Sequence, residues 1–516
     1  MSSRINKEKN VKMTMPENTI KTTPMMQQYL QIKKECPDAI LFYRMGDFYE
    51  MFLDDAKIAS AILGLTLTSR SAAADKNRVP MCGLPYHAAD TYINRLIEHS
   101  YKVAICEQVE DPKLAKGIVK RAITRVITPG TLTGAAVLHK PQNNYLVSVY
   151  QQPQQEYGLA VVDLSTGEFK VVQLMDQEKL LSEITRLAPA ELLICPELKK
   201  DSRLISDIKR NLNVLISDVE PWSFDFTTAY QALTTHFKVQ NLRGFGCENM
   251  PAAICAAGAG LRYLQQTQKA GLLHINQLKL YSLSQFMILD STAQRNLELV
   301  RTMRGDKKLT LLSELDFTLT PMGRRMIVQW IQQPLLDIVR INERLDAIEF
   351  LSKNKNLKYK LDDRLKNIID LERLLGRISL GSANARDIFS LGRCLKFMPD
   401  LKNILKDTEC GLLEIISKGL DPLDDLAALI DTALREDAPL SVREAGMFKN
   451  GYNQQLDELL ALNCGAKQWI ANLQQKEIKR TGINSLKIKY NKIFGYYIEI
   501  TKANMHLAPQ DYMRKQ

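Results

Sequence analysis

Apolar and polar residues alternate in short blocks over the first part of the chain, a pattern typical of strands interleaved with helices. The apolar runs Ala39–Tyr43 and Val103–Cys106 predict strands, and helical spacing covers residues 48–62 between them. Thr91–Ile97 adds a further apolar segment. The mixture predicts an α/β unit over residues 39–105.

A second set of alternating elements follows the polar stretch Lys140–Asn144, where we expect a domain boundary. Pro129 and Gly130, shortly before it, are typical of a turn. The strand-like and helical segments over residues 145–265 are Tyr145–Tyr150, Leu159–Asp163, Glu168–Val172, Glu178–Leu187 (helical) and Glu191–Cys195. They predict a second α/β domain.

From about residue 290 the pattern changes to long helical periodicity, which predicts an all-α region. At its start Thr320 can cap a helix and Pro321 suits the first helical position. The apolar residues spaced for one helix face are Met322, Met326 and Trp330, before Pro334 ends the helix, and then Ile341, Leu345 and Ile348. Near the end of the chain, residues 485–501 alternate around Asn491 and Lys492, which predicts a two-stranded antiparallel ribbon.

Composition adds limits to this picture. A chain of 516 residues should form several domains. No run approaches the roughly 18 apolar residues of a membrane span, so we expect no membrane partner. The polar N-terminal residues predict a loose tail rather than a signal peptide, and therefore a cytoplasmic location. A net charge of +11 favours an anionic partner, although a basic surface without such a partner would have the same charge.

Candidate catalytic chemistry is sparse. The nine cysteines contain no CxxC pair, and none of the 25 glycines is followed by lysine, so a P-loop for ATP is absent. We therefore expect no enzyme activity, no cofactor and no metal in this chain. Asp163 on a strand raises the alternative of a metal-dependent nuclease, but a single carboxylate is weak support because two-metal sites need several.

The segment Tyr43–Phe52 has a complete structural interpretation. Gly46 permits a tight turn, and Asp47 could cap the following helix with Glu50 three positions on. Phe48 lies four residues before Phe52, so helical periodicity assigns it to a core.

Six further strings, together with Tyr43–Phe52, occur in the order and spacing of bacterial MutS DNA mismatch-repair proteins. They are Pro80–Ala88, Ile105–Gln108, Ile127–Thr131, Asp316–Met326, Phe494–Ile500 and His506–Pro509. The chain therefore resembles this family from about residue 22 onward, as an N-terminal portion that lacks the C-terminal ATPase domain.

The resemblance implies a multidomain α/β plus all-α protein. Its parts would be a disordered tail (1–21), a mixed α/β mismatch-binding domain (22–127), a linker (128–139), an RNase H-like α/β connector (140–270), a core and lever domain of long helices (280–455) and a small antiparallel β clamp (456–516).

The resemblance also implies site residues. The family's Phe-x-Glu motif, which recognises the mispair, corresponds to Phe48 and Glu50, and family positions that lie against DNA correspond to Met45 and Arg70. Lysines that could grip the DNA backbone form a run on the ribbon at 487, 489 and 492; a second run is Lys113, Lys116, Lys120, Arg121 and Arg125. Either run could be only a solvated face, and the ribbon is favoured because the family clamp closes over DNA.

The implied function is mismatch repair, through binding of mispaired or unpaired bases in duplex DNA. The implied partners are DNA with mismatches or small loops and a MutL-type protein, with a homodimer, ATP and Mg in the intact family protein and a nucleoid-associated cytoplasmic location. The alternatives are a non-discriminating fragment that acts as a partner-docking module and the metal-dependent nuclease.

Overall fold

The computed structural model describes residues 23–69, 79–110, 117–133, 142–153, 156–406, 408–442, 444–491, 495–509 and 511–513. The chain divides into two compact units. Unit 1 comprises Met1–Ala383 and Cys394–Leu423, and unit 2 comprises Asn384–Arg393 and Asp424–Gln516. Within the described ranges no helix is long and apolar enough to cross a membrane.

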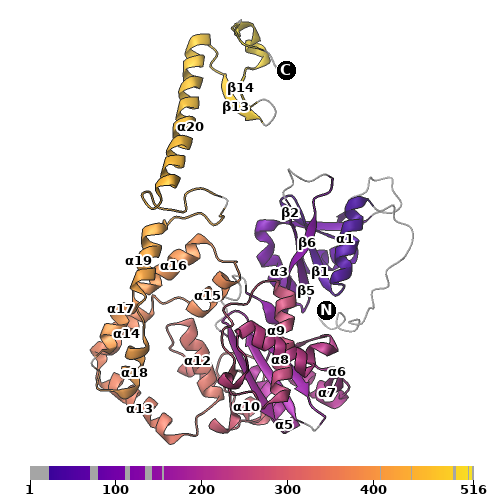
Figure 1. The fold of residues 1–516 in the computed structure, drawn as a ribbon, viewed down its shortest axis with the longest axis vertical. Coiled ribbons are helices and arrows are strands. Elements are labelled where there is room, and N and C mark those ends of the chain that lie inside the picture. The colour runs from indigo at the N-terminus through magenta and orange to yellow at the C-terminus, as the bar shows by residue number, and fades with distance from the viewer. Residues whose placement is uncertain are drawn as a thin grey trace. The chain divides into compact units, whose positions relative to one another are not determined.

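The first α/β module, residues 23–133 of unit 1, is drawn in indigo and violet in Figure 1. Its elements are α1 (Pro24–Glu35), β1 (Ala39–Met45), β2 (Phe48–Phe52), α2 (Leu53–Leu63), β3 (Thr68–Ser69), β4 (Pro80–Pro85), η2 (Tyr86–Ala88), α3 (Ala89–Glu98), β5 (Lys102–Gln108), β6 (Arg121–Ile127) and η3 (Pro129–Thr131). The six strands form one sheet in the order β3-β4-β2-β1-β5-β6, in which only β1 and β5 run parallel.

Alternate residues of β1 enter different cores because successive side chains of a strand point to opposite faces. Leu41 and Tyr43 pack against α1 on one face. Ile40 and Phe42 pack against α2 and α3 on the other. The sheet is thus covered by one helix on one face and two on the other, which agrees with the predicted α/β unit.

The prediction of a helix over residues 48–62 is wrong for its first five residues. Residues 48–52 form β2, and α2 begins only at Leu53. The reason is that β2 is hydrogen-bonded to β1 on one side and to β4 on the other, and this pairing outweighs local helical spacing. Asp47 lies in the turn and does not cap the helix, whose N-cap is Phe52 with no side-chain cap bond.

The second α/β module follows in unit 1. Its elements are β7 (Leu146–Gln151), β8 (Tyr157–Asp163), β9 (Glu168–Leu174), α5 (Gln177–Leu187), β10 (Glu191–Ile194), α6 (Pro196–Lys199), α7 (Ser202–Asn211), β11 (Leu215–Ser217), η4 (Pro221–Phe224), α8 (Phe226–Phe237), η5 (Arg243–Phe245), α9 (Pro251–Gln268) and β12 (Lys279–Leu280). The strand order is β11-β10-β7-β8-β9-β12. The strands and the helix predicted between residues 145 and 195 are confirmed.

Both faces of the second sheet are covered. Helices α8 and α9 pack on one face and α5 and α7 on the other. Gly258 allows α9 to approach α8 closely, since a Cβ there would lie 2.3 Å from the Cβ of Ala229. The module therefore has a dense core on each side of its sheet.

The helical region of unit 1 and the helices that continue it in unit 2 confirm the all-α prediction. Its elements are η6 (Leu283–Gln285), α10 (Ser291–Asn296), α11 (Leu311–Leu315), α12 (Pro321–Gln332), α13 (Ile338–Lys353), α14 (Lys355–Leu365), α15 (Leu371–Ser379), α16 (Ala385–Leu395), α17 (Met398–Leu405), α18 (Gly411–Gly419) and α19 (Asp424–Ala433). The predicted cap of α12 is confirmed, because the Thr320 hydroxyl accepts a bond of 3.0 Å from the Gly323 amide.

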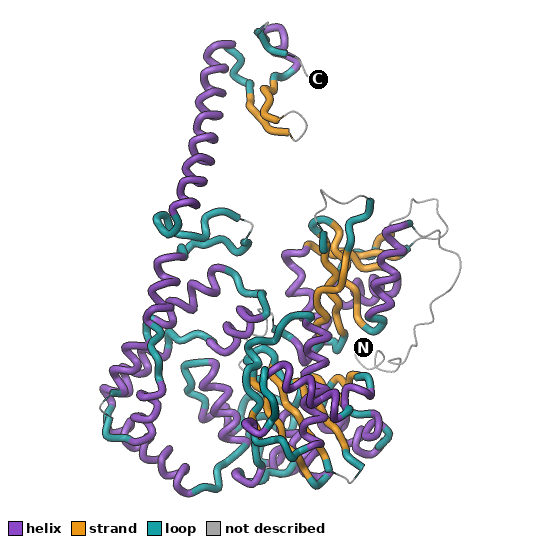
Figure 2. The backbone as a smooth tube through the Cα atoms, viewed as in Figure 1, coloured by secondary structure: helices purple, strands orange, loops and turns teal. Residues whose placement is uncertain are grey.

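Unit 2 ends in a long helix and a ribbon, shown as one purple helix and two orange strands in Figure 2. These are α20 (Gln454–Thr481), β13 (Lys487–Asn491) and β14 (Gly495–Glu499), followed by η7 (Lys502–Leu507). The strands pair antiparallel, which confirms the predicted ribbon.

Candidate nucleic-acid interface

The hairpin of β1 and β2 places the predicted recognition residues on one face. Gly46, in the turn, has a φ of +58°, a left-handed conformation that glycine adopts at low cost. Across the hairpin Met45 is paired with Phe48, and Tyr43 with Glu50. Because paired residues and residues two apart share a face, Met45, Phe48 and Glu50 all lie on the α1 side of the sheet.

Phe48 and Phe52 share that face but not its environment. Phe52 is fully buried, with its ring centroid 5.0 Å from that of Tyr29 on α1. Phe48 keeps 48% of its surface exposed. The core formed with α1 includes Phe52 but not Phe48, so an apolar ring remains available at the turn end of a strand that is otherwise anchored.

Glu50 has a glycine as its neighbour on β4. Gly83 is its cross-strand partner, and a Cβ at Gly83 would lie 3.7 Å from the Cγ of Glu50. Since glycine carries no side chain, this side of Glu50 is not covered by its cross-strand neighbour. The carboxylate and the Phe48 ring can therefore face the same ligand.

The other face of the hairpin is fixed by aromatic and charged contacts. The buried Tyr49 donates its hydroxyl hydrogen to Glu107, and burial followed by this contact raises the pKa of Tyr49. The Arg44 guanidinium lies 3.8 Å from the ring centroid of Tyr86 and 5.5 Å from that of Tyr49. These contacts hold β2, the strand that carries Phe48, against its neighbouring strands.

Arg121 anchors the end of β1. Its Nε donates to the Arg44 carbonyl oxygen at 2.7 Å, and Nη2 lies 3.4 Å from the Met45 sulfur. Its guanidinium also lies 4.9 Å from the ring centroid of Tyr43. Only 9% of Arg121 is exposed, so it belongs to the structure of the hairpin rather than to a solvated basic run. Sequence reasoning missed this role, because β6 lies far from β1 along the chain.

Several predicted DNA contacts lie outside the described residues: Arg70, Lys492, Lys113 and Lys116. Of the remaining members of that second run, Lys120 is exposed, whereas Arg125 is partly buried and its burial lowers its pKa. The second run is therefore not a uniform surface.

Unit 2 presents a separate candidate surface on its ribbon. Lys487 and Lys489 are two residues apart on β13, so they share a face, and both are exposed. Lys489 forms an ion pair of 2.5 Å with Glu499 on β14, and this bond raises the pKa of Lys489. The carboxylate offsets part of the positive charge of the ribbon.

The opposite face of the ribbon carries an aromatic pair. Tyr490 and Tyr496 are cross-strand partners, with ring centroids 5.2 Å apart, and both are exposed. Sequence reasoning did not single out these tyrosines. The alternation of lysine with apolar residues in Lys487–Tyr490 was the available signal, since it gives the two faces different chemistry.

Comparison with known families decides the relationship. MutS domain I matches residues 23–136, MutS domain II matches residues 144–276, and MutS domain III matches residues 292–506. The chain belongs to the MutS family. The β1–β2 hairpin lies within the match to MutS domain I, and the ribbon lies within the match to MutS domain III.

Comparison with individual relatives supports the same family. The chain is 46% identical over 502 residues to the DNA mismatch repair protein MutS of Alkaliphilus oremlandii, covering 96% of this chain and 57% of the relative. It is 48% identical over 501 residues to that of Halothermothrix orenii, covering 96% and 55%. The chain thus spans little more than half the length of these relatives.

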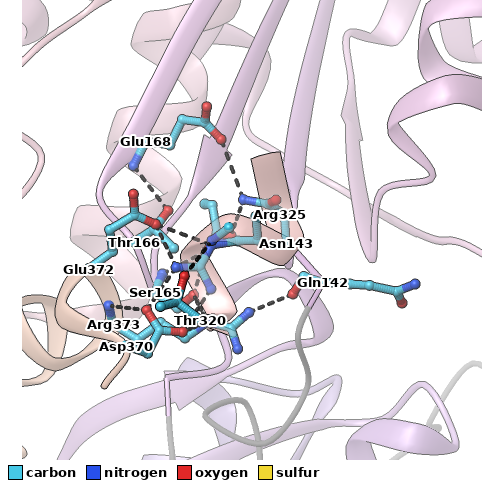
Figure 3. Close-up of polar contacts among 12 residues, drawn as sticks. Gln142, Asn143, Ser165, Thr166, Glu168, Thr320, Arg325, Asp370, Glu372 and Arg373 are labelled. Carbon is cyan, nitrogen blue, oxygen red and sulfur yellow. Dashed lines mark hydrogen bonds and ion pairs between the residues drawn. The ribbon is translucent and has the colours of Figure 1, made fainter. Parts of the chain in front are cut away.

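Asp163, the residue behind the nuclease alternative, is engaged in structural hydrogen bonds. One carboxylate oxygen accepts from the amide and the hydroxyl of Ser165, at 2.9 and 2.6 Å. The other accepts from the Asn143 side chain and the Asn144 amide, each at 3.0 Å. Figure 3 shows Ser165 and Asn143 in this polar cluster. Among the described residues no group of three or more His, Cys, Asp or Glu side chains could hold a metal ion.

The ATP and Mg that the resemblance implies for the intact family protein do not fit this sequence. A P-loop needs a lysine directly after its last glycine to contact the phosphates. None of the 25 glycines of this chain is followed by lysine.

Proposed function

We propose that this chain recognises mispaired or unpaired bases in duplex DNA through Phe48 and Glu50, as part of DNA mismatch repair. The observation that carries the proposal is the exposed Phe48 ring at the turn of an anchored hairpin, with Glu50 beside it on the same face. The relatives, each a DNA mismatch repair protein MutS, support the same assignment.

Recognition would depend on the deformability of DNA. Mispairs share no single pattern of groove atoms, so a protein that binds many of them must detect weak pairing instead. Phe48 inserted at a base step would stack on a mispaired base and kink the duplex. Unstacking costs a few kcal/mol per step and costs less where pairing is already weak, so mispairs are bound preferentially.

Glu50 would act as a discriminator. Its carboxylate can accept a hydrogen bond from a displaced base, whereas phosphates near a well-stacked duplex repel it. Well-paired DNA that offers no such bond is therefore penalised. Met45, paired with Phe48, would lie against the same groove, and Arg70 against the DNA backbone.

The other parts of the chain would grip DNA and bind partners. We assign the first α/β module to mismatch binding, the second to an RNase H-like connector, the long helices to the core and levers, and the ribbon to a clamp that contacts phosphates through Lys487, Lys489 and Lys492. A MutL-type protein would dock on the connector, and the intact family protein would act as an ATP-dependent homodimer.

The test is fluorescence anisotropy of the chain and its Phe48→Ala variant on G·T and matched duplexes at one salt concentration. Stacking of one aromatic ring on a base contributes about 1–3 kcal/mol, so the variant should lose mismatch preference by about fivefold or more. Phe226→Ala removes a similarly exposed phenylalanine, 43% exposed, from α8 of the second module and should leave the preference unchanged.

A Phe48→Ala variant that still prefers the mismatch would contradict the wedge assignment. If the unaltered chain binds both duplexes equally, the partner-docking alternative is favoured over mismatch recognition. Metal-dependent cutting of duplex DNA would instead favour the nuclease alternative.

A further inference from the structure

A buried carboxylate bridges the two α/β modules of unit 1. Glu191, the first residue of β10, is fully buried. Its Oε1 accepts hydrogen bonds from the hydroxyls of Ser217 and Tyr263, the latter at 2.6 Å, both within the second module. Its Oε2 accepts from the hydroxyl of Thr128 and from the amide of Gly130, the latter at 3.1 Å, both at the end of the first module. Each carboxylate oxygen of Glu191 therefore accepts hydrogen bonds from one module.

The turn that reaches Glu191 is shaped for this contact. It follows β6 and comprises Thr128 and η3 (Pro129–Thr131), all of them buried. A Cβ on Gly130 would lie 2.8 Å from the Cβ of Glu191, so only glycine brings the backbone amide this close. The Asn144 side chain also donates to the Pro129 carbonyl oxygen, at 2.8 Å.

The donors around Glu191 are all neutral, and no lysine or arginine within the described ranges forms an ion pair with it. Burial, followed by the nearby Glu191 carboxylate, raises the pKa of Tyr263, so its phenol stays protonated and can donate. Two donors on each oxygen satisfy a buried acceptor. Removal of a donor on one side weakens the bridge on that side only.

The bridge is connected, through neighbouring strands of the first sheet, to the β1–β2 hairpin that carries Phe48 and Glu50. The turn continues β6, β6 pairs with β5, and β5 pairs with β1. β1 in turn carries β2 with Phe48. The Gln268 side chain of α9 adds a second contact to β6, at the carbonyl oxygen of Val126, with a distance of 3.4 Å. The orientation of the hairpin on the second module thus depends on the end of β6.

We propose that Glu191 is a positioning residue for mismatch recognition: it fixes the first α/β module on the second, and so sets the direction from which Phe48 and Glu50 approach the duplex. This inference rests on the proposed function and adds to it a residue that does not touch DNA. A wedge that approaches from a variable direction stacks less well on the base, so mismatch affinity falls more than affinity for matched duplex, which does not accept the wedge.

The test compares Thr128→Val with Thr128→Ser. Valine keeps the shape of threonine but removes the hydroxyl, which donates to Glu191 and also contacts the Thr131 hydroxyl within the turn, whereas serine retains both contacts. Hydrogen exchange at the Gly130 amide reports the bridge without DNA, and anisotropy on G·T and matched duplexes reports recognition. We expect Thr128→Val to exchange faster and to lose about fivefold in mismatch preference, with Thr128→Ser close to the unaltered chain. Tyr263→Phe, which weakens the bridge at the other oxygen, should act in the same direction.

The ratio of the two affinities separates positioning from simple loss of folded protein, because unfolded protein lowers binding to both duplexes equally. Faster exchange in Thr128→Val with an unchanged ratio would overturn the positioning role and leave the proposed function standing. Unchanged exchange in both Thr128→Val and Tyr263→Phe would overturn the bridge itself. An unaltered chain without mismatch preference would overturn the proposed function, and with it the recognition role of Glu191. This outcome is distinguishable from the others because the unaltered chain is measured before any variant.

Discussion

At the scale of single residues, His274 connects the second α/β module to the helical region of unit 1. Its Nε2 lies 2.8 Å from the Leu164 carbonyl oxygen, a distance at which a neutral ring donates. Its backbone amide donates to the Ser379 hydroxyl of α15, at 3.1 Å. The Nδ1 atom is buried, with no hydrogen-bond partner in the described part of the chain, so a second ring proton there would be unsatisfied.

This environment predicts a pH dependence of stability. Burial lowers the pKa of His274 in the folded state, whereas the unfolded imidazole titrates at about 6.5. The unfolded state therefore binds more protons in this range, and the stability contribution of His274 is present above about pH 6.5 and is lost as the pH falls below it. We expect His274→Gln, whose amide can still donate to Leu164, to be less sensitive to acidification.

Urea unfolding measures this effect at about pH 8 and about pH 5.5, followed by the fluorescence of Trp222 in the second module after Trp330 and Trp469 are replaced by phenylalanine. His99→Gln, at an exposed histidine of the first module, is the control and should behave like the unaltered chain. An equal loss of stability in His274→Gln and in the unaltered chain would show that other groups cause the acid sensitivity.

At the scale of elements, β2 shows which part of the site could be predicted. A spacing of four residues places two side chains on the same side in both a helix and a strand, so Phe48 and Phe52 could not distinguish the two. The pairing of β2 with β1 and β4 decides that this segment is a strand, and the local sequence gives no information about such pairing. The turn at Gly46, a local feature, was predicted correctly, whereas the exposure of Phe48 depends on which part of the strand α1 covers.

The ribbon of unit 2 gives a prediction at the same scale. Because Glu499 pairs with Lys489, Glu499→Gln should release this lysine to bind phosphate. Each phosphate contact changes the slope of log K against log salt by about 0.9, so the slope should steepen by about that amount in Glu499→Gln and flatten by about that amount in Lys487→Gln. Both changes should affect matched and mismatched duplexes alike, since phosphates carry no sequence information.

Anisotropy titrations over a range of salt concentrations provide the measurement. Glu458→Gln on α20 makes the same change of charge elsewhere in unit 2 and should leave the slope nearly unchanged. If all these variants shift affinity without altering the slope, the ribbon lies outside the DNA interface.

At the scale of the whole molecule, the order of the modules was predictable, whereas the joints between them were not. Arg373 of α15 is almost fully buried, at 1% exposure, and reaches the second module (Figure 3). Its Nη2 donates to the Gln142 carbonyl oxygen at 2.5 Å and its Nε to the Ser165 hydroxyl at 3.2 Å. Such a joint combines segments far apart in sequence, so periodicity gives no sign of it.

Two further features hold α15 in this place. Arg325 of α12 binds both carboxylate oxygens of Asp370, the N-cap of α15, at 2.7 Å each. Gly376 lets the helix approach the second module, because a Cβ there would lie 2.4 Å from the Ser165 carbonyl oxygen. The second module and the helical region of unit 1 should therefore unfold together rather than one after the other.

Arg373→Met tests this cooperativity. Methionine fills much of the buried volume but leaves the Gln142 and Ser165 oxygens without their donor, so we expect α15 to lose stability by about 3–5 kcal/mol, the cost of breaking a buried charged contact. Hydrogen exchange at increasing urea concentration should then show α15 opening before β8, whereas the two open together in the unaltered chain. Arg377→Met changes another arginine of the same helix, whose Nη2 donates to the Ser382 carbonyl oxygen just after α15, and should keep the two transitions together. Separate openings in the unaltered chain would mean that the buried arginine joins the parts without coupling their stability.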